Sequence, residues 1–276
     1  MKLLIIGGNG MAGSVMVDYF RQQPGYEVIF TTRDKDFPGS IFLDATDFTA
    51  VESLVNEEKP QVIINCTGLL NQKAEEQYQD AIKVNGVLPH LLAKLADYSG
   101  AKLIHISTDC VFSGDKGSYT EDDHTDGQSV YALTKALGEV RDSRHLTIRT
   151  SIIGPEKRSE GIGLFKWFME QTGVVKGFRN VLWNGVTTLE LAKFTQACIE
   201  EGVTGLYHLT SSETVSKFEL LKMIQAEFNK EDISIVPDSE NKLDRTLRNT
   251  RTDFRYDFPG YSKMLSEMHA WMNKNG

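Results

Sequence analysis

Near its start the chain reads Leu4-Ile5-Ile6-Gly7-Gly8-Asn9-Gly10-Met11-Ala12-Gly13. This stretch satisfies the pattern Gly-x-Gly-x-x-Gly from Gly8 and the related pattern Gly-x-x-Gly-x-x-Gly from Gly7. Glycines let a backbone turn tightly and approach a pyrophosphate, whose charge is stabilised by amide groups at the start of the next helix. The pattern joins a predicted strand to a predicted helix, so we expect every residue from Gly7 to Gly13 to bind a dinucleotide rather than form a chance turn.

Short apolar runs alternate with longer amphipathic stretches through the first half of the chain. The runs at residues 3–6, 28–30, 62–64, 103–106 and 146–148 are strand-sized and rich in Ile, Leu and Val. The amphipathic stretches at residues 11–22, 50–57, 81–98 and 130–141 predict helices between them. This alternation predicts an α/β fold in which a doubly wound parallel sheet carries helices on both faces.

The alternation loosens after about Thr150, where glycines and aromatic residues interrupt short segments. Amphipathic stretches return at residues 189–200, 217–228 and 261–273, around a strand-like run at residues 205–209. We therefore expect residues 1–150 to form a dinucleotide-binding domain. Residues 151–276 are expected to form a smaller substrate-binding lobe that shares some elements with it.

The composition narrows the class of protein. The chain has 276 residues, 40% of them hydrophobic, and a formal net charge of −8. An acidic chain repels nucleic acid. The apolar runs fall short of the ~18 residues of a membrane span and of a signal peptide, which predicts a cytoplasmic protein without a membrane partner. Three separated cysteines and six scattered histidines predict no disulfide framework and no metal site.

The end of the second predicted strand bears on the choice of cofactor. An Asp or Glu in this place commonly binds the ribose 2′-hydroxyl of NAD. Here the sequence is Thr31-Thr32-Arg33-Asp34. Arg33 suits the 2′-phosphate of NADP, although Asp34 leaves NAD open and Arg33 could be an ordinary surface charge.

Further cofactor contacts are expected where later strands end. Asp44 and its neighbour Ala45 follow a short apolar run, where a carboxylate could meet an adenine amino group. Cys66-Thr67-Gly68 ends the strand at 62–64 with the small groups that a nearby cofactor requires. Cys66 is interpreted as a small apolar group rather than a reactive thiol.

A candidate catalytic set lies farther along. Thr108 follows the strand at 103–106, at the edge of the sheet where ligands bind. Tyr131 and Lys135 are four residues apart in a predicted helix, so both can reach one site. A nearby ammonium lowers the pKa of a phenol, which makes Tyr131 a usable proton donor, while Thr108 would hold the reacting oxygen.

A basic segment near the carboxyl end is the last candidate. Between residues 241 and 256 the cations are Lys242, Arg245, Arg248, Arg251 and Arg255, against Asp244 and Asp253. The segment is either a solvated charged face or a clamp for a diphosphate, for which arginine is well suited. Arg245 is the first candidate for such a clamp and Arg251 the second.

Together these motifs resemble the extended short-chain dehydrogenase/reductases, and within them the dTDP-4-dehydrorhamnose reductase family. The matching stretches are the Gly7–Gly13 loop, Val84-Asn85, the run from Ser107 to Gly114, Tyr119 to Asp123, Tyr131 to Glu139, Arg149-Thr150-Ser151 and Gly185-Val186-Thr187.

The resemblance implies a Rossmann domain with a small substrate lobe and hydride transfer to C4 of a nucleotide-diphospho-4-keto-6-deoxy sugar. It assigns the chemistry to Thr108, Tyr131 and Lys135. Asn85, Tyr131 and Lys135 are expected beside the cofactor. The expected substrate contacts are Thr108, Asp109, Cys110, Val111 and Arg245.

Departures from the family pattern keep alternatives open. Cys110 replaces a Tyr that usually lies beside the substrate, and Val186 replaces a Pro, which leaves the sugar undecided. Related dehydratases have an Asp-Glu pair after the threonine, whereas this chain has Asp109 and Cys110, so reduction is favoured over dehydration. A C4 epimerase, a non-catalytic dinucleotide-binding regulatory subunit and association into a homodimer stay open.

Overall fold

A computed structural model describes residues 1–158 and 160–275 of the chain. Its central layer is a seven-stranded parallel sheet. The strands are β1 (Lys2–Ile6), β2 (Glu27–Thr32), β3 (Ile41–Phe42), β4 (Val62–Asn65), β5 (Lys102–Ile106), β6 (Leu146–Arg149) and β10 (Gly205–His208). Their order, β10-β6-β5-β4-β1-β2-β3, contains the 3-2-1-4-5-6 arrangement of dinucleotide-binding sheets. The predicted α/β, Rossmann-like fold is confirmed.

The apolar runs form central strands because both of their faces are buried. Successive side chains of a strand point to opposite faces, and β1 supplies one residue after another to two different cores. Leu3 and Ile5 pack in the core that contains Met16, whereas Leu4 and Ile6 pack in the core that contains Val51. A strand between two helical layers has no polar face, which explains its continuous apolar sequence.

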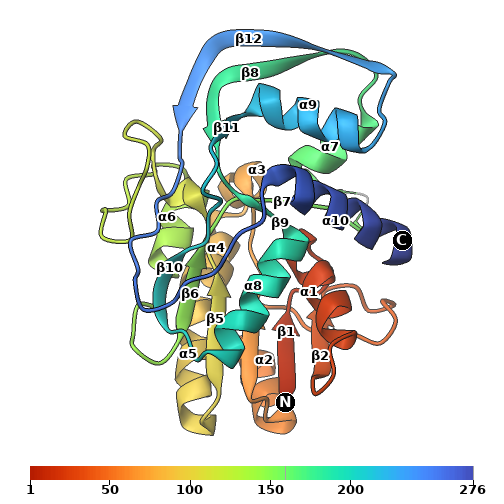
Figure 1. The fold of residues 1–276 in the computed structure, drawn as a ribbon. Helices are drawn as coiled ribbons and strands as arrows, with labels where there is room; N and C mark the ends of the chain where they lie inside the picture. Colours follow the sequence, from red (N-terminus) through yellow and green to blue (C-terminus); the bar gives the residue numbers. More distant parts are fainter. Residues whose placement is uncertain (159, 276) are drawn as a thin grey trace.

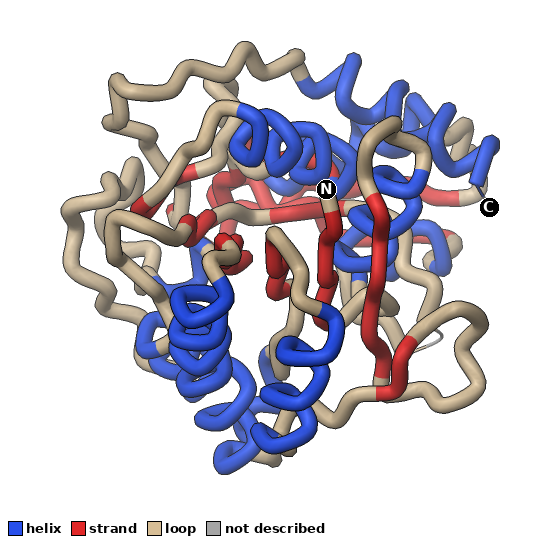
Figure 2. Tube along the Cα trace, turned by 90° about the horizontal axis from the view of Figure 1, so that it is seen from below, coloured by secondary structure: helices blue, strands red, loops and turns tan. Residues whose placement is uncertain are grey.

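Helices cover both faces of the sheet, as Figure 2 shows. One core includes residues of α1 (Met11–Arg21), α8 (Thr188–Glu200) and α10 (Tyr261–Asn275). The other includes residues of α2 (Phe48–Glu58), α3 (Asn71–Glu76), α4 (Tyr78–Ala81), α5 (Leu88–Ser99) and α6 (Val130–Leu137). In the part of the chain that the structure describes, no helix is both long and apolar enough to cross a membrane.

Two predicted helices differ in detail from the observed ones. The stretch predicted at 81–98 contains the end of α4, a π-helical segment (η1, Ile82–Val87) and α5. The helix predicted at 130–141 ends at Leu137. There the chain passes so close to η1 that a side chain at Gly138 would overlap the carbonyl oxygen of Asn85. Amphipathic periodicity predicts the helical face but not this contact between neighbouring segments.

The second half of the chain builds a separate layer and also returns to the first. Its three-stranded sheet has the order β11-β8-β12, from β11 (Val215–Ser216), β8 (Gly173–Trp183) and β12 (Ile233–Asp244). A small two-stranded sheet pairs β7 (Ile152–Ile153) with β9 (Val186–Thr187), and α7 (Leu164–Glu170) and α9 (Lys217–Glu227) complete the lobe. Figure 1 shows β8 and β12 arching together above the central sheet. Yet α8 packs against α1 on the central sheet, and β10 is a strand of that sheet. The chain therefore returns to the central layer after residue 187.

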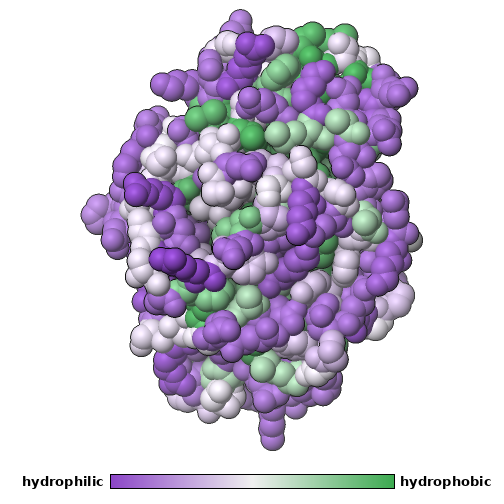
Figure 3. Space-filling model, in the orientation of Figure 1, coloured by the Kyte–Doolittle hydropathy of each residue, from purple (hydrophilic) through white to green (hydrophobic). Residues whose placement is uncertain are grey.

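The face seen in Figure 3 is largely hydrophilic, with small scattered hydrophobic patches. Such scattered apolar residues are normal for a protein surface.

The glycine loop between β1 and α1 is held by close backbone packing. Gly7 has a φ of +86°, in the region that favours glycine. Its carbonyl oxygen accepts a hydrogen bond from the Gly10 amide at 3.0 Å. Added side chains at Gly8 and Gly13 would overlap the Phe30 ring and the Gly7 carbonyl group, respectively. The loop can therefore bring α1 against β1 only with glycine at these positions.

Replacing Gly13 tests this packing. Ala in a helix is usually favoured over Gly by roughly 0.5–1 kcal/mol. We expect Gly13→Ala instead to lower the free energy of unfolding by about 1–3 kcal/mol, because the new methyl group meets backbone that cannot move freely. Urea denaturation measures the change.

The matched control is Gly10→Ala, whose methyl group would lie 3.4 Å from the Gly7 oxygen, an ordinary contact. A Gly13→Ala variant as stable as Gly10→Ala would contradict the packing argument.

Candidate functional site

The carboxyl ends of the central strands open into two adjoining clefts. A cleft of about 710 Å³ lies over the glycine loop and the ends of β2 and β4. A second, of about 990 Å³, extends from that loop to Thr108, Tyr131 and Lys135. Asn9, Gly10 and Thr67 line both, so the two form one continuous groove. Ligands of open α/β sheets bind in this position.

Most of the residues predicted to hold a cofactor line this groove. They are Gly7, Asn9, Gly10, Met11, Ala12, Arg33, Asp44, Ala45, Cys66, Thr67 and Gly68. Asn9 Oδ1 is buried and has no hydrogen-bond partner among the described residues. A buried acceptor without a donor costs roughly 1–3 kcal/mol. The orphaned acceptor and the exposed glycine backbone fit a bound dinucleotide, while Gly8 and Gly13 serve the packing described above.

At the end of β2, Arg33 is the group best placed to meet a ligand. The Thr32 hydroxyl donates to the Asp34 carbonyl oxygen at 2.8 Å and accepts from the Asp34 amide. Arg33 is exposed and makes no hydrogen bond or ion pair with the described part of the chain. Hydrogen bonds from Thr46 lower the pKa of Asp44, and the charge of Arg33 adds to this effect. Arg33 thus lies near enough to Asp44 to affect its pKa and makes no hydrogen bond with the described part of the chain.

The same cleft has cations that the sequence analysis missed. Lys73, Lys157 and Arg158 line it from elements remote in sequence. Lys157 pairs with Asp18 at 2.7 Å, and Arg158 lies 3.6 Å from Glu160. The only sequence signal was a pair of basic residues shortly after Gly154-Pro155.

The predicted catalytic residues come together at the second cleft. Thr108 caps a short 3₁₀ turn (η2, Asp109–Val111): its hydroxyl accepts from the Cys110 amide and donates to Asp109 Oδ1, both at 3.1 Å. Tyr131 is in the first turn of α6, and Lys135 follows one turn later. Lys135 Nζ donates to the carbonyl oxygen of Ile106 at 2.7 Å. The end of β5 and one face of α6 therefore present an alcohol, a phenol and an amine to the same space.

Burial changes the acidity of these groups. It raises the pKa of Tyr131 above its ordinary value, against the effect of the neighbouring Thr108 hydroxyl, and it lowers the pKa of Lys135 to about 8. Burial also raises the pKa of Cys66 and of Cys110 to about 12. The expectation that a nearby ammonium lowers the pKa of Tyr131 is therefore wrong for this structure, because burial raises it. At neutral pH the phenol is protonated, as a proton donor requires, and both thiols are un-ionised.

A second pair of cations approaches the Asp109–Cys110 turn from the lobe. Arg245 donates to Cys110 Sγ at 3.5 Å, and its Nε is buried without a partner in the described chain. Lys217, the first residue of α9, lies over the Trp183 ring at 5.0 Å. Burial lowers the pKa of Lys217 to about 8, although Asp109 opposes this, and burial raises the pKa of Asp109. Periodicity placed Lys217 in a helix but gave no sign of this position.

Three candidate residues have other surroundings. Val111 is wholly buried in a cluster with Phe112, Tyr119 and Leu247. Asn85 bonds the backbone amide and carbonyl of Leu69 and the Thr134 hydroxyl, so it braces the loop after β4. Arg251 pairs with Asp253 and donates to the carbonyl oxygens of Thr204 and Leu206. These contacts give all three a structural part.

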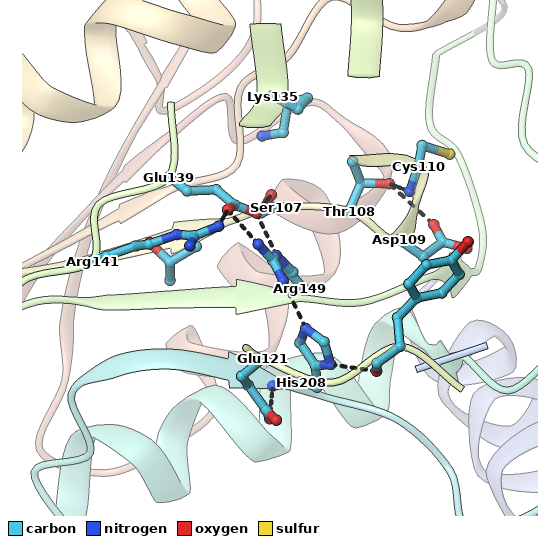
Figure 4. A network of polar contacts seen from close by, with 12 residues as sticks. Ser107, Thr108, Asp109, Cys110, Glu121, Lys135, Glu139, Arg141, Arg149 and His208 are labelled. Atoms are coloured by element: carbon cyan, nitrogen blue, oxygen red, sulfur yellow. Dashed lines mark hydrogen bonds and ion pairs between the residues drawn. The ribbon is translucent and has the colours of Figure 1, made fainter. Parts of the chain in front are cut away.

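A buried ion pair fixes the rear of the site (Figure 4). Arg149 donates two hydrogen bonds to Glu139, at 2.6 and 2.7 Å, and both side chains are inaccessible to solvent. Glu139 also accepts from Ser107 Oγ at 3.1 Å and from Arg141 at 2.8 Å. On its far side Arg149 lies 3.0 Å from His208 Nε2, and His208 Nδ1 lies 3.1 Å from the Tyr119 carbonyl oxygen. The network links the ends of β5, α6, β6 and β10.

The described residues contain no group of three or more His, Cys, Asp or Glu side chains that could hold a metal ion.

Comparison with known proteins identifies what the chain is similar to. Residues 1–253 match the family described as the RmlD substrate binding domain. The probable low-salt glycan biosynthesis reductase Agl14 of Haloferax volcanii is 30% identical over 240 residues, 78% of this chain and 76% of the relative. Methionine adenosyltransferase 2 subunit beta of Xenopus tropicalis is 26% identical over 263 residues, 90% of this chain and 78% of the relative. The crystal structure of a dTDP-4-dehydrorhamnose reductase from Clostridium acetobutylicum superposes with a TM-score of 0.82 at 27% identity, covering 99% of this chain and 100% of the other.

The Glu139–Arg149 pair yields a test of stability. Burial alone would raise the pKa of Glu139, but the hydrogen bonds and charge of Arg149 outweigh it and lower that pKa. Glu139→Gln leaves a buried guanidinium without its counter-charge, so we expect the free energy of unfolding at neutral pH to fall by about 3–5 kcal/mol. Urea denaturation at neutral pH measures it.

Because the pKa of Glu139 is lowered in the folded protein, the pair stabilises the fold at neutral pH, and this contribution disappears as the pH falls through that lowered value. The difference between Glu139→Gln and the unchanged protein should therefore shrink in acid. Glu240→Gln, at an exposed position of β12, is the control and should change little. Equal stability of the two variants would refute the argument.

Proposed function

The chain belongs to the family of the RmlD substrate binding domain, and from that premise we propose that it is an NADPH-dependent reductase of a nucleotide-diphospho-4-keto-6-deoxy sugar. The observation that carries the proposal is the convergence of Thr108, Tyr131 and Lys135 on a groove continuous with the glycine loop. Residues 1–150 would hold the dinucleotide and residues 151–276 the sugar. The cytoplasmic location and the homodimer stay predictions.

In this proposal NADPH supplies a hydride to C4 of the sugar. The Thr108 hydroxyl positions the C4 oxygen, and the protonated Tyr131 phenol donates its proton to that oxygen as negative charge develops there. Lys135 in its charged form stabilises the phenolate that remains. The glycine-loop amides and Arg33 would bind the phosphates of the cofactor.

The sugar-nucleotide end is assigned to the lobe. Arg245 contacts Cys110 and keeps a buried, unpartnered Nε, so it can donate to an oxygen of the substrate. This position is beside the Asp109–Cys110 turn, next to Thr108. Arg245 would therefore bind the diphosphate of the substrate. Cys110 occupies less space than a tyrosine would, which leaves more room for sugar substituents.

A regulatory subunit is the second candidate, because Methionine adenosyltransferase 2 subunit beta aligns with 90% of this chain. The two functions differ in turnover. A reductase consumes NADPH when a 4-keto sugar nucleotide is added, which the loss of NADPH absorbance measures. A regulatory subunit binds NADPH without consuming it, and a C4 epimerase converts its substrate with no net loss of NADPH.

The proton donor is tested by Tyr131→Phe, which keeps the buried ring and removes the hydroxyl. We expect the rate of NADPH oxidation to fall by roughly 10²–10⁴, the usual effect of losing a general acid, with NADPH affinity almost unchanged. Tyr98→Phe, at a position 78% exposed, is the control and should keep full activity. Near-normal turnover by Tyr131→Phe would show that Tyr131 is not the proton donor.

The cofactor preference is tested by Arg33→Ala. We expect NADPH binding to weaken by about 1.5–3 kcal/mol, the scale of a hydrogen bond to a charged group, while NADH binding stays unchanged. Fluorescence titration with each cofactor gives both affinities. Lys35→Ala removes an exposed charge from the same loop and should alter neither. Equal losses for NADPH and NADH would show that Arg33 does not contact a 2′-phosphate.

A further inference from the structure

Behind the groove, a buried chain of polar groups reaches Lys135, and the proposed reaction makes no use of it. Asn65, at the end of β4, and His105, on β5, are both fully buried. Asn65 Oδ1 accepts from the Thr67 amide at 3.1 Å and from the Thr67 hydroxyl at 2.6 Å. Asn65 Nδ2 lies 3.2 Å from His105 Nδ1, and His105 Nε2 lies 3.3 Å from Lys135 Nζ.

The hydrogen-bond donors and acceptors among Asn65, Thr67 and His105 determine which nitrogen of the imidazole carries the proton. A backbone N–H can only donate, so the atom of Asn65 that faces the Thr67 amide is its oxygen. Asn65 therefore turns its NH₂ group toward His105, and Nδ1 must accept. Burial lowers the pKa of His105 well below its ordinary value, so the ring is neutral. A neutral ring that accepts at Nδ1 carries its proton on Nε2.

That proton points at Lys135. A protonated Lys135 has three donors and no acceptor, so its N–H groups and the Nε2–H of His105 would be two donors without an acceptor between them. A neutral Lys135 amine has a lone pair and accepts this hydrogen bond. In either form Lys135 keeps its bond to the Ile106 carbonyl oxygen. The hydrogen-bond geometry thus favours the neutral form, in addition to the effect of burial.

The other groups around Lys135 oppose this only in part. Glu139, just beyond the end of α6, favours the charged form, whereas the Cys66 thiol, after β4, is un-ionised; burial prevails and lowers the pKa of Lys135 to about 8. Tyr131, on the same helix, is un-ionised at this pH because burial raises its pKa. Lys135 consequently exists in both forms near pH 8.

We infer that Asn65 and His105 make Lys135 a proton-exchanging group by presenting it with a hydrogen-bond donor, and that Lys135 takes up a proton when a dinucleotide binds in the groove. The second part of this inference, proton uptake on dinucleotide binding, rests on the proposed function. Lys135, Gly10 and Met11 line one cleft, and a phosphate charge held there favours the ammonium form. His105 and Asn65 are thereby positioning residues, which act on the reaction through Lys135.

The first test uses the unchanged protein without any ligand. Nitrogen-15 NMR of the histidine rings distinguishes an Nε2–H from an Nδ1–H tautomer, and we expect His105 to carry its proton on Nε2. Carbon-13 NMR of labelled lysine follows the titration of Lys135, whose signal is identified by its absence from Lys135→Met. We expect a midpoint near 8, as burial implies. An Nδ1–H tautomer would overturn the inference.

The second test reverses the hydrogen bond. In Asn65→Asp both side-chain oxygens can only accept, so the imidazole proton moves to Nδ1 and Nε2 offers its lone pair to Lys135. We expect Lys135 to titrate about one pH unit higher or more. Because aspartate also attracts Lys135 through space, His105→Gln is the uncharged companion, since its amide oxygen can accept from the ammonium group. It should shift the titration in the same direction.

Asn241→Asp, at an exposed position of β12, adds the same charge and should leave Lys135 unaffected. If Lys135 titrates at the same pH in Asn65→Asp and His105→Gln as in the unchanged protein, the inference fails.

Proton uptake is measured by calorimetry of NADPH binding, slightly above pH 8, in two buffers of different ionisation enthalpy. We expect uptake of about half a proton or more in the unchanged protein, since a pKa near 8 leaves that fraction to be filled. In Asn65→Asp, where Lys135 is already mostly protonated at this pH, the uptake should fall to about a fifth of a proton or less. If the unchanged protein binds NADPH without taking up a proton, the second part of the inference is wrong.

Neither measurement requires a sugar nucleotide. A protein that shows the expected tautomer, titration and proton uptake but never consumes NADPH would therefore refute the reductase function and leave this inference standing.

Discussion

The buried pair of Glu139 and Arg149 is the interaction on which the arrangement of the site depends. Glu139 follows the helix that carries Tyr131 and Lys135, and through Ser107 it also holds the strand end next to Thr108. Arg149 ends the neighbouring strand and extends the same network to His208, on the strand that the second half adds to the sheet. Removing either charge would leave the other buried and unpaired, which is strongly destabilising, so the pair holds these elements together. The ends of β5 and α6, which carry the alcohol and the phenol, are therefore tied together from behind by Glu139 and Arg149, neither of which lines the groove.

The glycine loop imposes the complementary constraint at the other end of the groove. Its backbone approaches α1 so closely that Gly13 has no room for a side chain, and this closeness brings the first amides of the helix to the cleft. The glycine loop and the ion pair have different roles. The loop exposes backbone donors to an anionic ligand, whereas the ion pair aligns side chains for proton transfer. The sheet joins them, because parallel strands end at one edge and deliver both sets of groups to the same groove.

Local sequence patterns were sufficient for the sheet, the glycine loop and the Thr108, Tyr131 and Lys135 positions, because each depends on periodicity or on spacing within one or two elements. They were insufficient where the outcome depends on distant segments. Val111 follows Cys110 in a motif but points into a cluster with Tyr119 and Leu247, and Arg251 is bound to carbonyl groups of a strand about forty-five residues earlier. Arg158 reaches the groove from the second half of the chain, where only its place in a basic pair after Gly154-Pro155 sets it apart, and Lys217 lies near Asp109 with no local sequence signal. The π-helical η1 segment likewise reflects its packing against α6 rather than its own amphipathic pattern.

Charge distribution explains how an acidic chain can suit an anionic ligand. The chain has a net charge of −8, yet four cations (Arg33, Lys73, Lys157 and Arg158) line one cleft against three carboxylates (Asp34, Asp44 and Glu160). Arg245 contacts Cys110, which lines the second cleft. Low-dielectric walls concentrate the field of such cations within a cleft, so the local potential can oppose the net charge. The same burial that strengthens this field lowers the pKa of Lys135 and of Lys217 to about 8, close enough to neutrality for a bound anion to change their protonation. The proposed link between ligand charge and lysine protonation therefore concerns Lys135, which lines the groove, and its strength depends on the contacts of that lysine with Ile106 and His105.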